Sequence, residues 1–108
     1  MYLSYCKEFS DVRIDLAHGH FVKDAVHALH ECPNVWIDIS FMELVEIKNV
    51  WAVAPDRVMY GSDFPAPLRY WNHSCTQYMR REIEAVQKLG GDDMLRKNAL
   101  MFLKGGYR

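Results

Sequence analysis

Val58-Met59-Tyr60-Gly61-Ser62-Asp63-Phe64-Pro65 is a short apolar run that ends in glycine, serine, a carboxylate and proline. A run of this kind is typical of a buried strand, and α/β proteins carry their chemistry at the C-terminal tips of parallel strands. Asp63 therefore stands where a functional carboxylate is expected. The competing interpretation is an aspartate that only stabilises a turn and has no catalytic or binding role, because Asp-Phe-Pro also suits a turn.

Two runs upstream have the same form as this strand. Val12 to Ala17 leads into His18, and Asn34 to Ile39 leads into Ser40. Successive right-handed βα units place all strand C-termini on the same side of a parallel sheet. The sequence thus predicts three parallel strands in chain order, with His18, Ser40 and Asp63 close together at one edge of the sheet.

Helical periodicity fills the intervals between these strands. Apolar spacing predicts helices over residues 21–31, 41–53, 74–89 and about 92–103, and residues 2–9 have the pattern of a helix tail. Ser74 and then Asp92 or Asp93 are the expected caps of the last two helices, and Gly90-Gly91 should separate them. Two prolines, at 65 and 67, predict an aromatic loop over residues 68–72. Strands alternate with helices, so the predicted fold class is α/β.

Composition bounds the class of protein. With 108 residues, half of them apolar, and a formal net charge of -1, the chain suits one globular domain spanning residues 1–108. This charge gives no reason to expect nucleic acid, and no apolar run approaches the roughly 20 residues of a membrane span. The start of the chain lacks the basic segment of a secretory signal, so a cytoplasmic location is expected. Cys6, Cys32 and Cys75 form no Cys-x-x-Cys pair and are expected to be reduced, structural thiols.

Four segments in order resemble a known family: Leu16-Ala17-His18-Gly19, Cys32 to Ser40, Pro55 to Pro65, and Lys97-Asn98-Ala99. Together they resemble the C-terminal part of the amidohydrolase-related family, metal-dependent hydrolases and decarboxylases built on a (β/α)8 barrel. The resemblance covers nearly the whole chain but only about the last three of the barrel's eight strands, and a complete barrel needs about 250 residues. The expected fold is a partial (β/α)8 barrel of about three parallel βα units with a C-terminal helix.

The resemblance also implies roles for residues at the strand tips. In the family, the aspartate at the position of Asp63 binds a divalent metal, zinc or manganese, or handles a proton beside it. The histidine at the position of His18 acts as general base or acid near that metal. His20 departs from the family's His-Gly-Gly and is the candidate third ligand beside His18 and Asp63. His18-Gly19-His20 could also be the His-x-His pair of a first barrel strand, but the sixteen residues from His18 to Asn34 suit a late strand better.

Strand alternation assigns side chains to the two faces of the sheet. The residues expected to face the barrel interior are Val12, Ile14, Leu16, His18, Val35 or Trp36, and Met59. Arg13 and Asp15 fall on the opposite face, which is expected to pack on helices, and charges there indicate that this strand lies at an edge of the sheet. Asp38 and Ser40 share a face of the next strand, where Ser40 could line the pocket and Asp38 could tie down a loop.

Other polar residues are weaker candidates for chemistry. His27 and His30 are three apart on a helix but belong to its polar face, so solvated side chains are expected. His73 follows the aromatic loop and could reach the site from above. Asn98 is expected to donate hydrogen bonds to backbone carbonyls, which is a structural role.

The number of metal ligands limits the predicted function. A divalent catalytic site usually takes at least three protein ligands. The first hypothesis is therefore a fragment or truncated member of the family, whose chemistry is metal-assisted hydrolysis or nonoxidative decarboxylation of a small-molecule substrate, inactive as a single chain. The second hypothesis is a noncatalytic α/β module that self-associates as a binding or scaffold protein. Open sheet edges favour self-association, as a homodimer, in either case.

Overall fold

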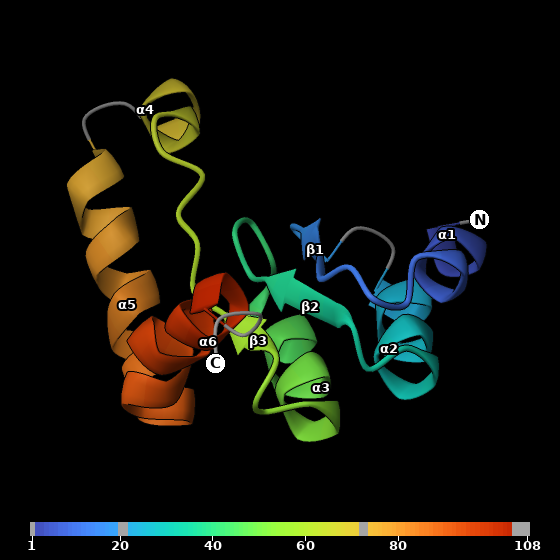
Figure 1. The fold of residues 1–108 in the computed structure, drawn as a ribbon. Coiled ribbons are helices and arrows are strands. Elements are labelled where there is room, and N and C mark those ends of the chain that lie inside the picture. Colours follow the sequence, from blue (N-terminus) through green and yellow to red (C-terminus); the bar gives the residue numbers. More distant parts are fainter. Residues whose placement is uncertain (1, 20–21, 72–73, 105–108) are drawn as a thin grey trace.

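Three parallel strands form one sheet in the computed structural model, which describes residues 2–19, 22–71 and 74–104 (Figure 1). In their order across the sheet, the strands are β1 (Ile14–Ala17), β2 (Val35–Asp38) and β3 (Val58–Met59). Both pairs of neighbouring strands are parallel. The predicted α/β class and the predicted strand order are confirmed.

Helices flank and connect the strands. In chain order they are α1 (Tyr2–Glu8), α2 (Val22–Glu31), α3 (Leu44–Val53), α4 (Ala66–Trp71), α5 (Cys75–Asp92) and α6 (Asn98–Lys104). A single π-helical turn, Asp93–Lys97, joins α5 to α6. The helices predicted over residues 2–9, 21–31 and 41–53 are confirmed, with somewhat shorter bounds.

The hydrophobic core lies between the sheet and the pair α2 and α3. On this α2–α3 face, β2 and β3 contribute the fully buried Val35, Ile37 and Val58, and Ile14 and Leu16 of β1 pack against the same cluster. The prediction that Ile14 and Leu16 face a barrel interior, away from the helices, is therefore wrong. Of the two alternatives for β2, Val35 lies on this helix-covered face and Trp36 on the other. The crossover helices of the βα units cover the more continuously apolar side of the strands, because that side loses most surface to water on packing.

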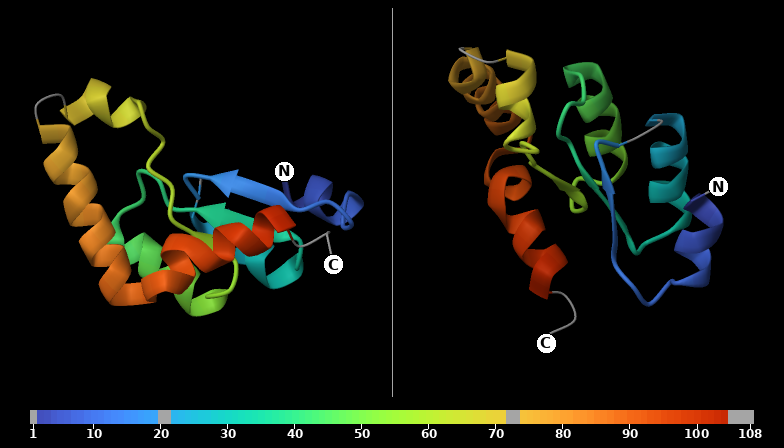
Figure 2. Two further views of the ribbon diagram at one scale, coloured as in Figure 1. Left: turned by 60° about the vertical axis from the view of Figure 1, so that its left-hand side comes forward. Right: turned by 90° about the horizontal axis from the view of Figure 1, so that it is seen from above.

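The opposite side of the sheet carries Asp15, Trp36 and Met59, and α6 crosses it (Figure 2). On this α6 face, the rings of Trp36 and Phe102 meet edge to face with centroids 5.5 Å apart. Nη1 of Arg13 donates a hydrogen bond to the Phe102 carbonyl at 2.9 Å. Arg13 and Asp15 thus lie away from α2 and α3, which corrects the predicted facing, and β1 is an edge strand, as their charges indicated.

The segment after β3 departs from prediction in two places. A helix, α4, replaces the predicted aromatic loop, because Pro67 occupies the first turn of a helix, where its missing N–H has no acceptor to lose. Helix α5 begins after Ser74 as predicted, but Ser74 makes no side-chain cap hydrogen bond. Gly91 has a left-handed φ of 55° that kinks the helix, and helical structure resumes at once instead of restarting from a capping aspartate.

Two polar side chains tie the ends of the elements together. The Asn98 amide donates to the carbonyls of Pro55 and Val58 at 2.7 and 2.9 Å, which confirms its predicted structural role. The guanidinium of Arg57 donates to three carbonyls at the end of α2 and the start of β2. Both contacts fix where β3 begins relative to its neighbours.

Several isolated side chains lie where the sequence predicts. Cys6, Cys32 and Cys75 are free and buried, as predicted. His27 and His30 are exposed on α2, also as predicted. Within residues 2–19, 22–71 and 74–104, no helix has the length and apolar character needed to cross a membrane.

Candidate active site

The tips of the three strands bring His18, Ser40 and Asp63 together, as predicted from their places in the sequence. His18 follows β1 directly, and Ser40 and Asp63 lie just beyond β2 and β3. Oγ of Ser40 lies 2.7 Å from Nδ1 of His18, and Nε2 of His18 lies 3.7 Å from Oδ2 of Asp63. One imidazole ring therefore reaches both of the other strand tips.

Asp38 extends this contact into a chain of hydrogen bonds. Its Oδ1 accepts from the Ser40 hydroxyl at 2.5 Å and from the Ser40 backbone N–H at 2.9 Å. Because the hydroxyl hydrogen is directed to Asp38, Oγ of Ser40 accepts from His18, so Nδ1 of the ring carries a hydrogen. The Ser40 carbonyl, 3.2 Å from Nδ1, is a second acceptor. Asp38 therefore orients the imidazole through Ser40, and sequence reasoning had assigned it no such role.

The other ring nitrogen faces Asp63 across an open gap. The 3.7 Å separation of Nε2 and Oδ2 is longer than a hydrogen bond, and the two side chains keep 36% and 46% of their surface exposed. In a neutral His18 with a hydrogen on Nδ1, Nε2 presents a lone pair toward a carboxylate oxygen. A proton or a cation between the two atoms would be stabilised by both of them.

Each strand tip contains a residue with left-handed backbone. The φ angles of His18, Phe41 and Asp63 are 67°, 59° and 54°. A non-glycine residue in this region costs on the order of 1 kcal/mol, and such residues concentrate at functional sites. Strand parity predicted that His18 shares a face with Leu16. The left-handed turn breaks the alternation of β1 at His18, so the imidazole instead lies beside Ser40 and Asp63.

Gly61 makes room for the Asp38 carboxylate. A Cβ atom at Gly61 would lie 2.8 Å from Oδ1 and 2.9 Å from Cγ of Asp38. A larger residue would push this carboxylate away from Ser40 and release the imidazole. The glycine of the Gly-Ser-Asp segment is therefore required by a contact between neighbouring strand tips.

Two charges of the same sign meet on the α6 face. Asp15 lies on β1 beside Asp38 of β2, and although part of its side chain is exposed, burial and the charge of Asp38 raise the pKa of Asp15 to about 6. The positive charge of a protonated His18 acts in the opposite direction. The folded chain thus disfavours the ionised form of Asp15.

We expect Asp15→Asn to increase the stability of the protein at pH 7. A folded-state pKa of about 6, above the ordinary value of about 3.9 in the unfolded chain, means that stability is lost as pH rises between these values. The asparagine variant lacks this loss. Urea denaturation at one fixed protein concentration, low enough to keep the chain monomeric, repeated from pH 4 to pH 7, measures it. A variant whose stability falls as steeply as that of the parent would contradict the assignment.

A second polar cluster lies between β3 and α5, and sequence reasoning missed it. The Tyr78 hydroxyl donates to Oε2 of Glu82 at 2.8 Å, and the Tyr60 hydroxyl is buried beside the same carboxyl group. Burial raises the pKa of Glu82, and the contacts with Tyr78 and Tyr60 oppose that effect. Burial, followed by the charge of Glu82, also raises the pKa of Tyr60 to about 12. The helical spacing of Tyr78 and Glu82 was a visible signal, but their proximity to Tyr60 depends on where α5 packs.

The predicted metal ligands are only partly brought together. His18 and Asp63 offer two donors, one fewer than a catalytic divalent site usually takes. In the described part of the chain, no group of three or more His, Cys, Asp or Glu side chains is arranged to hold a metal ion. His20, the predicted third ligand, and His73 lie outside the described residues. The donor set that the structure describes does not by itself fit a catalytic metal.

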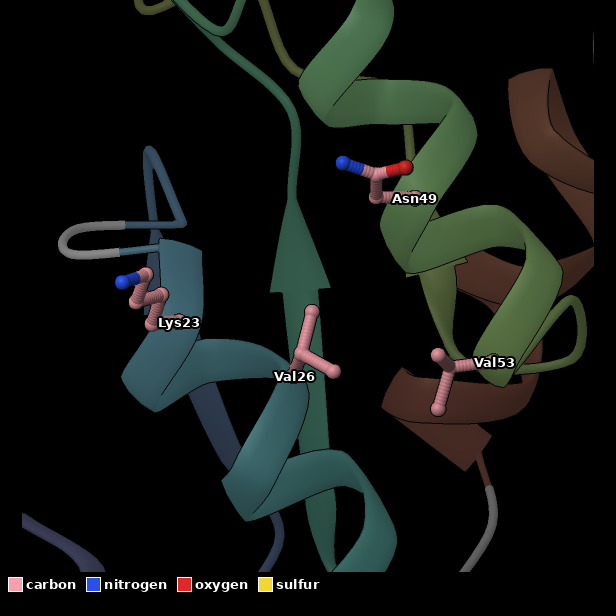
Figure 3. A pocket seen from close by; sticks show the side chains of 4 residues that line it. All are labelled: Lys23, Val26, Asn49 and Val53. Atoms are coloured by element: carbon pink, nitrogen blue, oxygen red, sulfur yellow. The ribbon is translucent and has the colours of Figure 1, made fainter.

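Two surface grooves are lined by residues of the helices. One groove of about 410 Å³ runs between α2 and α3 and is lined by Lys23, Val26, Asn49 and Val53 (Figure 3). Another, of about 460 Å³, lies between α3 and α5. Neither of these two grooves is lined by His18, Ser40 or Asp63.

Comparison with known proteins identifies the family of the chain. The amidohydrolase family profile matches residues 6–104, and the chain belongs to that family. No curated protein and no solved structure gives a significant match. Members of this family are generally metal-dependent.

Proposed function

We propose that the chain carries the acid–base part of an amidohydrolase-type active site and does not turn over substrate as a single chain. The observation that carries this proposal is the geometry of His18, whose Nδ1 is held by Ser40 while Nε2 faces Asp63. An imidazole held in one tautomer, with its other nitrogen directed at a carboxylate, is arranged to take or give a proton at Nε2.

The proposed reaction class is hydrolysis of an amide, ester or lactone, or nonoxidative decarboxylation of an aromatic or unsaturated acid. In the family, the divalent metal supplies an activated water or polarises the substrate. The proposed role of His18 is to exchange a proton with the reacting group, and that of Asp63 is to hold the cation or the proton opposite Nε2. A complete site needs at least one further ligand, for which His20 is the candidate within this chain.

The isolated chain, loaded with zinc or manganese, is expected to show no turnover above background. Two donors are too few to hold a metal with an activated water at neutral pH. Aryl esters, lactones and dihydroxybenzoates, assayed with and without each metal, cover the proposed reaction classes. Turnover that disappears in Asp63→Ala would show that the single chain is active and would overturn this part of the proposal.

Zinc titration followed by NMR of the histidine rings tests the location of the site separately from activity. Zinc is expected to shift the His18 signals with weak affinity, and Asp63→Ala should abolish the shift. His27, exposed on α2, is the matched control, and its ring signals should not change. His20→Ala should weaken binding if His20 is the third ligand. A response confined to His27 or His30 would place the metal elsewhere and refute the site.

A further inference from the structure

The edge strand β1 has one hydrogen-bonding side without a neighbour in the described part of the chain. The N–H of Ile14 donates to the Asn34 carbonyl at 2.9 Å, so Ile14 and Leu16 direct their backbone groups toward β2. Asp15 and Ala17, which alternate with them, direct theirs outward, and both residues are exposed. An open edge of this kind is a template for pairing with another strand.

Exposed apolar side chains flank the same edge. Val12 and Phe9 have exposed fractions of 49% and 47% and lie in the segment that leads from α1 into β1, and Tyr5, with an exposed fraction of 61%, lies in α1. The Asn34 amide contacts the carbonyls of Phe9 and Val12 at 3.1 and 2.9 Å, which holds this segment in place beside the strand. Pairing at the edge would cover apolar surface that is now in water.

The charges along the edge are self-complementary. Arg13 and Asp15 flank Ile14 and lie on the α6 face. When two copies of β1 run antiparallel about a two-fold axis at Ile14, Arg13 of each copy stands opposite Asp15 of the other. An axis at Arg13 or at Asp15 would place like charges opposite each other, which is destabilising. An axis between residues would pair an outward-facing residue with an inward-facing one, which the hydrogen-bond pattern of antiparallel strands does not allow.

Asp15 has no lysine or arginine partner within the described residues. No Lys or Arg there forms an ion pair with it, and the neighbouring strand presents Asp38. Arg13 uses Nη1 for the Phe102 carbonyl and, as an arginine, has further N–H donors on its guanidinium group. A second copy would therefore supply the cation that Asp15 lacks.

We propose that β1 is a self-association surface and that its partner is a second copy of this chain. The two β1 strands pair antiparallel about a two-fold axis at Ile14, and two Arg13–Asp15 ion pairs form between the copies. The result is a continuous six-stranded sheet with the strand-tip clusters of the two copies at opposite ends. This inference does not rest on the proposed function.

Charge reversal tests the pairing. Analytical ultracentrifugation should show a monomer–dimer equilibrium, and Arg13→Asp or Asp15→Arg should each raise Kd by about tenfold or more by placing like charges opposite each other. The double variant restores opposite charges and should return Kd to within about threefold of the parent. Lys48→Asp and Glu84→Arg reverse exposed charges on α3 and α5 and should leave Kd unchanged. A monomer at every concentration, or a double variant as weak as the single ones, would overturn the proposal and leave the edge to a different partner.

Cysteine cross-linking tests the register with side chains that carry no charge. Only a two-fold axis at Ile14 brings residue 14 of one copy opposite residue 14 of the other. These two residues form a non-hydrogen-bonded pair of the antiparallel ladder, in which the Cα atoms are about 4.5 Å apart. That separation is within disulfide range. Ile14→Cys should therefore form a disulfide-linked dimer under mild oxidation, while the parent, with its three buried cysteines, should not. Leu16→Cys, on the same face two residues on, is the matched control and should cross-link far less. Equal cross-linking of the two variants would refute the register.

Discussion

Replacing Arg57 with alanine is expected to lower the free energy of unfolding by about 3 kcal/mol. Its guanidinium is half-buried and donates to the carbonyls of Leu29, Cys32 and Val35 at 2.8, 2.8 and 2.9 Å. The carbonyls of Leu29 and Cys32 lie at the C-terminal end of α2, where a positive charge also interacts favourably with the helix dipole. Removing the side chain leaves all three acceptors without this donor and releases β3 from the α2–β2 connection.

Urea denaturation followed by circular dichroism measures this loss, with two variants as controls. Arg57→Lys keeps the charge but cannot reproduce the forked geometry, so an intermediate loss is expected. Arg96→Ala removes an exposed arginine that pairs with Asp92 on the surface, and its loss of stability should be much smaller than that of Arg57→Ala. Equal losses for Arg57→Ala and Arg96→Ala would show that the carbonyl contacts contribute little.

The topology and the strand tips could be predicted because each signal is local. Each apolar run ends in a polar residue, and the handedness of βα units then places His18, Ser40 and Asp63 on one side. The facing of the strands could not be predicted from alternation, because alternation separates two sets of side chains without identifying the set that the helices cover. The charges of Arg13, Asp15 and Asp38 on one set were the informative signal, since the crossover helices α2 and α3 cover the set that is free of charge.

The contacts within the site were predictable only in part. Asp38 and Ser40 are two residues apart, so their shared face could be read from the sequence, but their joint hold on His18 depends on the left-handed turn that ends β1. Strand periodicity cannot anticipate such a turn at a non-glycine residue. The contact of Tyr60 with Glu82 depends in the same way on the packing of α5, which no local pattern determines.

Replacing Asp38 with alanine is expected to change the tautomer of His18. In the parent, the Ser40 hydroxyl donates to Asp38 and accepts from Nδ1–H of the ring. Without the carboxylate, that hydroxyl is free to donate to Nδ1, so the ring hydrogen moves to Nε2, where it can donate to Asp63. The expected result is a nearly complete exchange of the two ring nitrogens between protonated and unprotonated states.

Nitrogen-15 NMR of the histidine rings distinguishes the two tautomers directly. Asp38→Asn keeps a side-chain oxygen that can accept from Ser40, so it should retain the hydrogen on Nδ1 in most molecules. Glu84→Ala, at an exposed position of α5, is the control for loss of a distant carboxylate and should have no effect. If His18 kept its hydrogen on Nδ1 in Asp38→Ala, the Ser40 carbonyl alone would be sufficient to orient the ring, and Asp38 would have no positioning role. If the hydrogen moves to Nε2, the hydrogen bonds that run from Asp38 through Ser40 are what keep the lone pair of Nε2 directed at Asp63 in the parent. The proposed acid–base role requires that arrangement.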